Sequence, residues 1–176
     1  MGDLLTWLAV LSAYLFGRIA EKRIHRFNYD LLTFAGAEEL IPRLMKWYYR
    51  LLFVFIPIGL LEFIAAQFRA PEWLPFAALG MIASAQLLRL WVIQTMGRLW
   101  TMRCMALPGA SVLKTGPFRF LRHPEYVSRV LDGMGIFLFV GSWVTALLYA
   151  VAVSAIALKI SKIERRQLSE FASEPI

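Results

Sequence analysis

Long apolar runs constrain the fold of this chain more than any other feature. Hydrophobic residues make up 59% of its 176 residues and gather in blocks. A helix needs roughly 20 residues to cross about 30 Å of hydrocarbon, and only closed hydrogen-bonding patterns are stable there. We therefore predict an all-α, polytopic integral membrane protein. It should have about five transmembrane helices, covering approximately residues 4–20, 48–68, 73–96, 126–140 and 143–163.

The order of these runs divides the chain into two parts. Residues 1–96 are expected to form a three-span N-terminal membrane anchor, in which residues 28–42 form a loop or a short helix on the membrane interface. Residues 97–176 contain a basic interfacial segment, a polar loop and two spans. Gly141 and Ser142 are a turn signal between these spans. We therefore predict a C-terminal helical hairpin.

Charge placement supports this topology. Of the 19 lysines and arginines, all but Arg69 fall within residues 18–50, 89–129 and 159–166. With five spans these three clusters lie on one side, so the positive-inside rule predicts an outside N-terminus and a cytoplasmic C-terminus. Because topology explains the net charge of +7, we do not expect nucleic acid as a partner. One cysteine and two histidines exclude an internal disulfide and predict no metal site.

The polar loop from Gly116 to Tyr126 is the strongest candidate for chemistry. Pro124 suits the first turn of a helix, which places His123 near the N-cap of the fourth span. A helix N-terminus carries partial positive charge and free N–H groups, so this end can bind an anion or a carboxylate. Phe118 and Tyr126 could supply flat apolar contacts. Composition alone also fits a loop whose basic residues only set topology or bind lipid head groups.

Specific motifs add a family resemblance. Residues 113–126 read LKTGPFRFLRHPEY, and an apolar hairpin and the sequence KIERRQL at 162–168 follow. This part of the sequence resembles the isoprenylcysteine carboxyl methyltransferase family. The pattern of that family is G-P-[YF]-R-[YF]-x-R-H-P-x-Y, followed by two helices and then by E-E-x-x-L. That family is similar to the membrane phospholipid methyltransferases. The resemblance covers about residues 90–170, and residues 97–109 are similar to the bacterial branch.

The resemblance implies a membrane methyltransferase that uses S-adenosyl-L-methionine in a cytoplasm-facing pocket. Its substrate would be a lipid-like amphiphile that enters sideways from the bilayer, here a bacterial inner membrane. Arg122 is a candidate for holding an anionic head group, and Asp132 and Glu164 are candidate bases. The implied cofactor-binding residues are Leu113, Gly116, Pro117, Phe118, Arg119, His123, Tyr126 and Glu164.

Other readings stay open at this point. The family often has two acids where this chain has Glu164 followed by Arg165. The methyl acceptor could be a carboxylate, a phenolic hydroxyl or an amine, and only the amine or a neutral hydroxyl would require a base. An NADPH-dependent membrane reductase of the sterol or steroid type is one alternative, and a non-catalytic lipid-binding membrane protein is another. The sequence does not predict the oligomeric state.

Overall fold

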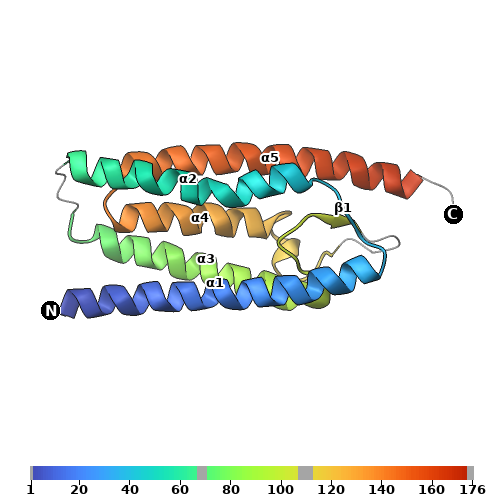
Figure 1. Cartoon of the computed structure of the whole chain (residues 1–176), viewed down its shortest axis with the longest axis horizontal. Coiled ribbons are helices and arrows are strands. Elements are labelled where there is room, and N and C mark those ends of the chain that lie inside the picture. The colour runs from blue at the N-terminus through green and yellow to red at the C-terminus, as the bar shows by residue number, and fades with distance from the viewer. Residues whose placement is uncertain (1, 67–70, 107–112, 174–176) are drawn as a thin grey trace.

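The computed structural model of the chain is a bundle of long helices (Figure 1). It describes residues 2–66, 71–106 and 113–173. Short 3-10 turns η1 (Gly97–Leu99) and η2 (Gly116–Arg119) follow the third helix and precede the fourth. The helices are α1 (Gly2–Phe34), α2 (Pro42–Ala66), α3 (Leu74–Met96), α4 (Pro124–Phe139) and α5 (Trp143–Ser173).

The helices confirm an all-α membrane protein. Within the described residues, three segments are long and apolar enough to cross a membrane: Pro42–Ala65, Leu74–Leu99 and Trp143–Glu164. These segments lie in α2, α3 and α5. At 1.5 Å per residue, the 16 residues of α4 extend roughly 24 Å, which is less than the hydrocarbon thickness. Five crossings therefore stay a prediction for α1 and α4.

The first helix is longer than the sequence suggested. We expected a span near residues 4–20 and a loop or separate interfacial helix from residue 28, but α1 continues without a break to Phe34. No glycine or proline occurs between Gly17 and Gly36, and Gly36 has a φ of 84°, a conformation that favours glycine at a helix end. The expected start of the interfacial segment at residue 28 was therefore wrong.

The short connection after α1 forms a small piece of sheet. Strand β1 (Glu38–Glu39) pairs antiparallel with β2 (Met105–Ala106), with Glu38 opposite Ala106. This pairing ties the α1–α2 connection to the segment that follows α3. It lies at the same end of the bundle as the η2 loop (Figure 1).

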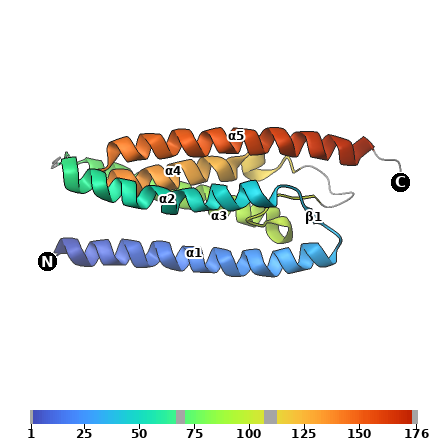
Figure 2. The same ribbon diagram turned by 45° about the horizontal axis from the view of Figure 1, so that its top comes forward.

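The helix α4 lies at the centre of the bundle. It packs between α3 and α5, and α2 lies alongside α5 (Figures 1 and 2). Two glycines permit this close approach. A Cβ atom at Gly133 would lie 1.9 Å from Cε1 of Tyr149 in α5, and one at Gly135 would lie 2.6 Å from Cγ1 of Ile82 in α3. Neither position has room for a side chain.

The helix α1 lies apart from α2 (Figure 2) and is tied to the bundle by polar contacts. The buried amide of Asn28 donates hydrogen bonds to the carbonyl oxygens of Gly97 at 3.0 Å and Trp100 at 2.7 Å. His25 Nδ1 accepts a hydrogen bond from the backbone N–H of Met102 at 3.1 Å. These bonds hold α1 against the chain that leaves α3.

A carboxylate from another helix caps the N-terminus of α5. Glu62 in α2 accepts hydrogen bonds from the backbone N–H groups of Val144 at 2.9 Å and Thr145 at 2.7 Å, and from the Thr145 hydroxyl at 2.6 Å. The first N–H groups of a helix lack partners inside the helix, and a negative charge there is favourable. Glu62 therefore joins α2 to the C-terminal hairpin.

We expect Glu62→Ala to destabilise the folded protein by about 1–2 kcal/mol, because it removes an N-terminal cap and leaves these donors unpaired. The measurement is unfolding of purified protein in mild detergent by added sodium dodecyl sulfate. Glu72→Ala is the matched control, because Glu72 is exposed in the turn before α3. Equal stability of the two variants would contradict the capping role.

Candidate functional site

The polar loop positions its residues by a turn and a helix start. Gly116 begins the 3-10 turn η2 with a φ of 58°, which a residue with a side chain rarely adopts. Pro124 is the first residue of α4, and His123 occupies the N-cap position, as predicted, without a side-chain capping hydrogen bond. The His123 ring is therefore left for other contacts.

Four side chains from α4 and α5 meet at this end of the bundle. His123 stacks on Tyr126, with ring centroids 5.2 Å apart and planes 16° from parallel. His123 Nε2 lies 2.8 Å from Ser161 Oγ, and His123 Nδ1 lies 3.9 Å from Glu164 Oε2. We call these residues the histidine cluster. His123 and Glu164 each expose about a quarter of their side chain, so the cluster is accessible from outside.

The other predicted cofactor residues surround this cluster in different environments. Pro117 is buried, and Leu113, Gly116 and Phe118 are half-buried. Arg119 is exposed, and its guanidinium carbon lies 5.8 Å from the centre of the Phe120 ring. The loop therefore contributes apolar groups near the helix start and directs Arg119 toward a neighbouring ring.

The three candidate catalytic residues do not come together. Glu164 belongs to the histidine cluster, and Arg122 is exposed. Asp132 lies nine residues after His123 on α4, which is roughly 13 Å along the helix axis. It is buried inside the bundle. A direct role for Asp132 beside Glu164 does not fit this geometry.

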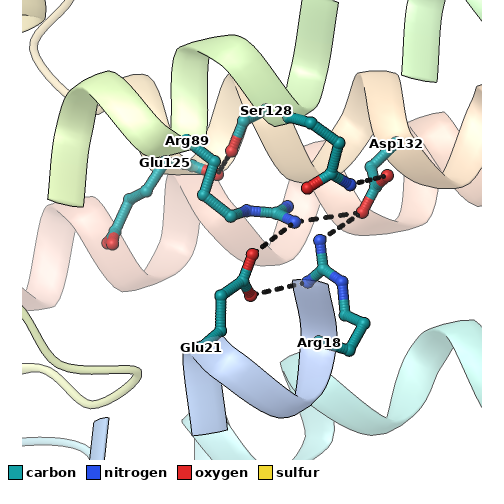
Figure 3. Close-up of polar contacts among 7 residues, drawn as sticks. Arg18, Glu21, Arg89, Glu125, Ser128 and Asp132 are labelled. Atoms are coloured by element: carbon teal, nitrogen blue, oxygen red, sulfur yellow. Dashed lines mark hydrogen bonds and ion pairs between the residues drawn. The ribbon is translucent and has the colours of Figure 1, made fainter. Parts of the chain in front are cut away.

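Asp132 instead belongs to a buried cluster of charges (Figure 3). Its carboxylate accepts hydrogen bonds from Arg18 at 2.8 Å, Arg89 at 3.2 Å and the Gln86 amide at 2.9 Å. Glu21 in turn pairs with Arg18 at 3.1 Å and Arg89 at 3.5 Å. We call these five residues the charge cluster; it joins α1, α3 and α4.

Sequence reasoning named His123, Tyr126 and Glu164 of the histidine cluster, but it missed Ser161 and most of the charge cluster. Arg89 drew attention because it is charged within an apolar run, but Arg18 and Glu21 are hidden in a dense basic stretch. Ser161 carries no signal beyond its spacing, since it lies three residues before Glu164 and therefore on the same helix face. Ion-pair geometry across three helices cannot be read from one sequence.

A large crevice lies between α1, α2 and α4. Its volume is about 1220 Å³, and most of its surface is apolar. Its apolar walls include Ile19 of α1, Phe53 and Ile56 of α2, and Ile136 and Phe139 of α4. Basic side chains also line it: Arg18, Lys22, Arg26, Lys46, Arg50, Arg103 and Arg129. The crevice thus combines an apolar volume with a cationic lining.

Two ionisable groups near the loop have altered acidity. Partial burial and the Glu164 carboxylate raise the pKa of Glu125 to about 7, although Arg129 opposes this shift. Burial, with the Glu164 and Glu125 carboxylates, raises the pKa of the Cys104 thiol well above its usual value. Both effects favour the neutral thiol of Cys104 over the reactive thiolate.

These features define a class: an all-α membrane protein with a polar loop that leads into α4 at Pro124, a histidine cluster at that helix start and an apolar crevice. Comparison with known families is more specific. Residues 78–169 match the isoprenylcysteine carboxyl methyltransferase (ICMT) family, and the chain belongs to it. Family membership indicates a membrane methyltransferase-like function. The chain is also similar to the uncharacterized protein YpbQ of Bacillus subtilis, at 25% identity over 94% of this chain and 98% of that protein. No solved structure matches significantly.

Gly116→Ala should destabilise the loop. The added Cβ would lie 2.4 Å from Thr95 Oγ1, and the backbone would keep a strained positive φ. We expect a loss of at least about 1–2 kcal/mol in unfolding free energy. The control is Gly80→Ala, because nothing lies within 4 Å of a Cβ there and alanine favours a helix. If Gly116→Ala were as stable as the wild type, the proposed requirement for glycine at this position would be refuted.

Glu125 should make stability depend on pH. Its pKa in the folded protein, about 7, exceeds the reference value of 4.5, so folding favours the neutral carboxyl. This contribution is complete below pH 4.5 and is lost as pH rises through about 7. Relative to wild type, Glu125→Gln should therefore gain roughly 1–2 kcal/mol between pH 5 and pH 8. Unfolding by detergent across that pH range measures the unfolding free energies of the variant and the wild type. A difference between the two that does not change with pH would contradict the assigned pKa of Glu125.

Proposed function

We propose that this protein is an S-adenosyl-L-methionine-dependent methyltransferase that acts on a lipid-like amphiphile at the cytoplasmic face of the membrane. The observation that carries the proposal is the histidine cluster at the start of α4, which lies within the region matched by the family. The cytoplasmic placement rests on the distribution of basic residues. The same distribution of basic residues fits a protein of a bacterial inner membrane.

The residues of the histidine cluster suit this cofactor chemically. The stacked rings of His123 and Tyr126 offer a flat surface for a base or a cationic group. The Glu164 carboxylate can attract the positive charges of S-adenosyl-L-methionine, and the Gly116–Arg119 turn can surround an adenosine. When bound, the cofactor supplies an activated methyl group on a sulfonium sulfur. The chain's part is then to orient the acceptor and exclude water.

The crevice supports an amphiphilic acceptor. Phe53 and Ile56 line it and are exposed on α2, a helix long enough to span a membrane. An alkyl chain could therefore pass from the bilayer into the crevice without crossing water. Arg129 lines the crevice and lies one turn from Glu125 and Tyr126 on α4. The polar end of such a molecule would approach the histidine cluster along this helix.

We expect His123→Ala to weaken binding of S-adenosyl-L-methionine at least tenfold, because it removes the ring stacked on Tyr126 and the contact with Ser161. Isothermal titration of purified protein in mild detergent measures the affinity. Lys162→Ala is the control, because Lys162 is exposed beside Ser161 on α5. Unfolding curves for both variants establish that the bundle is intact.

The same titration separates the competing functions. Wild-type protein that binds NADPH but not S-adenosyl-L-methionine would favour a reductase. Wild-type protein that binds neither, in detergent or in lipid nanodiscs, would favour a non-catalytic lipid-binding protein. Unchanged affinity of His123→Ala for S-adenosyl-L-methionine would place the cofactor elsewhere.

A further inference from the structure

The crevice has a charged end and an apolar end. On α2, Arg50 lines it near the start of the helix, and Ile56 lines it about 9 Å further along the axis. On α4, Arg129 comes first among the lining residues and Phe139 comes near the end of the helix. Both helices begin at the end of the bundle that holds the β1–β2 pair (Figure 1). The crevice therefore has the same polarity along its length as a lipid in one leaflet of a bilayer.

Two pairs of basic residues line the charged end from different helices. Lys22 and Arg26 lie four residues apart on α1, and Lys46 and Arg50 lie four residues apart on α2, so each pair occupies one helix face. All four side chains line the crevice and are exposed. We call these four residues the basic pairs. They bring four positive charges to one end of a single space.

The protein itself does not neutralise these charges. Among residues 2–66, 71–106 and 113–173, no carboxylate forms an ion pair with any member of the basic pairs. Two acids, Asp30 and Asp132, also line the crevice. Asp132 already accepts hydrogen bonds from Arg18 and Arg89, so Asp30 is left to offset the basic pairs. Because like charges one turn apart destabilise a helix, the basic pairs favour an anion from outside the chain.

A phospholipid with a net negative charge meets these requirements. Its phosphate accepts strong hydrogen bonds from arginine and lysine, and basic pockets between membrane helices bind such head groups. Its acyl chains would lie on the apolar walls, where Phe53 is 70% exposed on a helix long enough to span a membrane.

Other occupants fit the crevice less well. Its volume of about 1220 Å³ exceeds the roughly 300–1,000 Å³ of a typical small-molecule site, so it has room for more than one alkyl chain. A free phosphate would leave the apolar walls uncovered. A zwitterionic phospholipid would bring its own positive charge to the basic end.

We propose that the basic pairs bind the phosphate of one anionic phospholipid, whose acyl chains lie in the crevice between α1 and α2. This lipid is a resident ligand and not the methyl acceptor, so the inference does not depend on the proposed methyltransferase function. The lipid would fill the space that separates α1 from α2 (Figure 2). The acceptor would share the crevice and reach the histidine cluster along α4.

Native mass spectrometry of the purified protein in an uncharged detergent tests this assignment. With equal amounts of phosphatidylglycerol and phosphatidylcholine of the same acyl chains, the wild type should retain one phosphatidylglycerol at least about tenfold in preference. Equal retention of the two lipids would overturn the proposal. Displacement of the lipid by inorganic phosphate would assign the basic pairs to a free anion instead. Methylation of the retained lipid by added S-adenosyl-L-methionine would overturn its resident role.

The decisive variant combines Arg26→Gln with Arg50→Gln. It removes one charge from each of the basic pairs, and its affinity for phosphatidylglycerol should fall at least about tenfold. The control combines Arg23→Gln with Arg43→Gln, because these exposed residues lie on the same two helices and do not line the crevice. An equal loss of affinity in both variants would indicate a general attraction to anionic lipid and overturn the site.

Thermal unfolding of the same proteins gives a second readout. A ligand that binds only the folded state raises its stability, so phosphatidylglycerol should raise the unfolding temperature of the wild type and the control more than that of the Arg26→Gln, Arg50→Gln variant. Without lipid, this variant should be as stable as the wild type or slightly more stable, because it has fewer like charges. Lower stability of the variant without lipid would show that the two arginines stabilise the fold themselves, and this result would overturn the assignment.

Discussion

The charge cluster is the interaction on which the rest of the arrangement depends. Arg18 and Glu21 of α1 meet Arg89 of α3 and Asp132 of α4 within hydrogen-bonding and ion-pairing distance, and three of these four residues are buried. Removing one partner of such a network leaves an uncompensated buried charge, which is more costly than the network is stabilising. The cluster therefore determines where α1 attaches: against α3 and α4, and apart from α2 (Figure 2). That attachment leaves the crevice between α1, α2 and α4.

The functional elements follow one another along α4. Its N-terminus carries His123 and Tyr126 and meets Glu164 of α5, and one turn later Arg129 lines the crevice. Asp132, less than another turn on, anchors α1. Gly133 permits Tyr149 to pack against the same helix, so α4 cannot easily shift relative to α5. A single short helix thus relates the polar loop, the histidine cluster and the first helix to one another.

The sequence predicted the features that depend on neighbouring residues. Apolar runs located α2, α3 and α5, although α2 begins at Pro42 rather than near residue 48 and α5 continues to Ser173 rather than ending near residue 163. Pro124 correctly located the start of α4. The loop motif led to the family. Features that depend on contacts between distant segments were missed. The sequence predicted a short span for α1 because the second half of this helix is charged. That charged half contacts the rest of the bundle through Asn28, His25 and Glu21. The resemblance made Asp132 a candidate base, whereas in the structure two helices, α1 and α3, supply the donors that pair it.

The central claim is that the histidine cluster and the crevice together serve methyl transfer to an amphiphile. Its most direct measurement uses purified protein with S-adenosyl-L-methionine labelled in the methyl group and lipids extracted from membranes, followed by mass identification of any labelled product. The account predicts a labelled product with an alkyl chain, absent when His123→Ala replaces the wild-type protein. No transfer by folded wild-type protein that binds the cofactor, with lipids from several membrane sources, would contradict the claim itself.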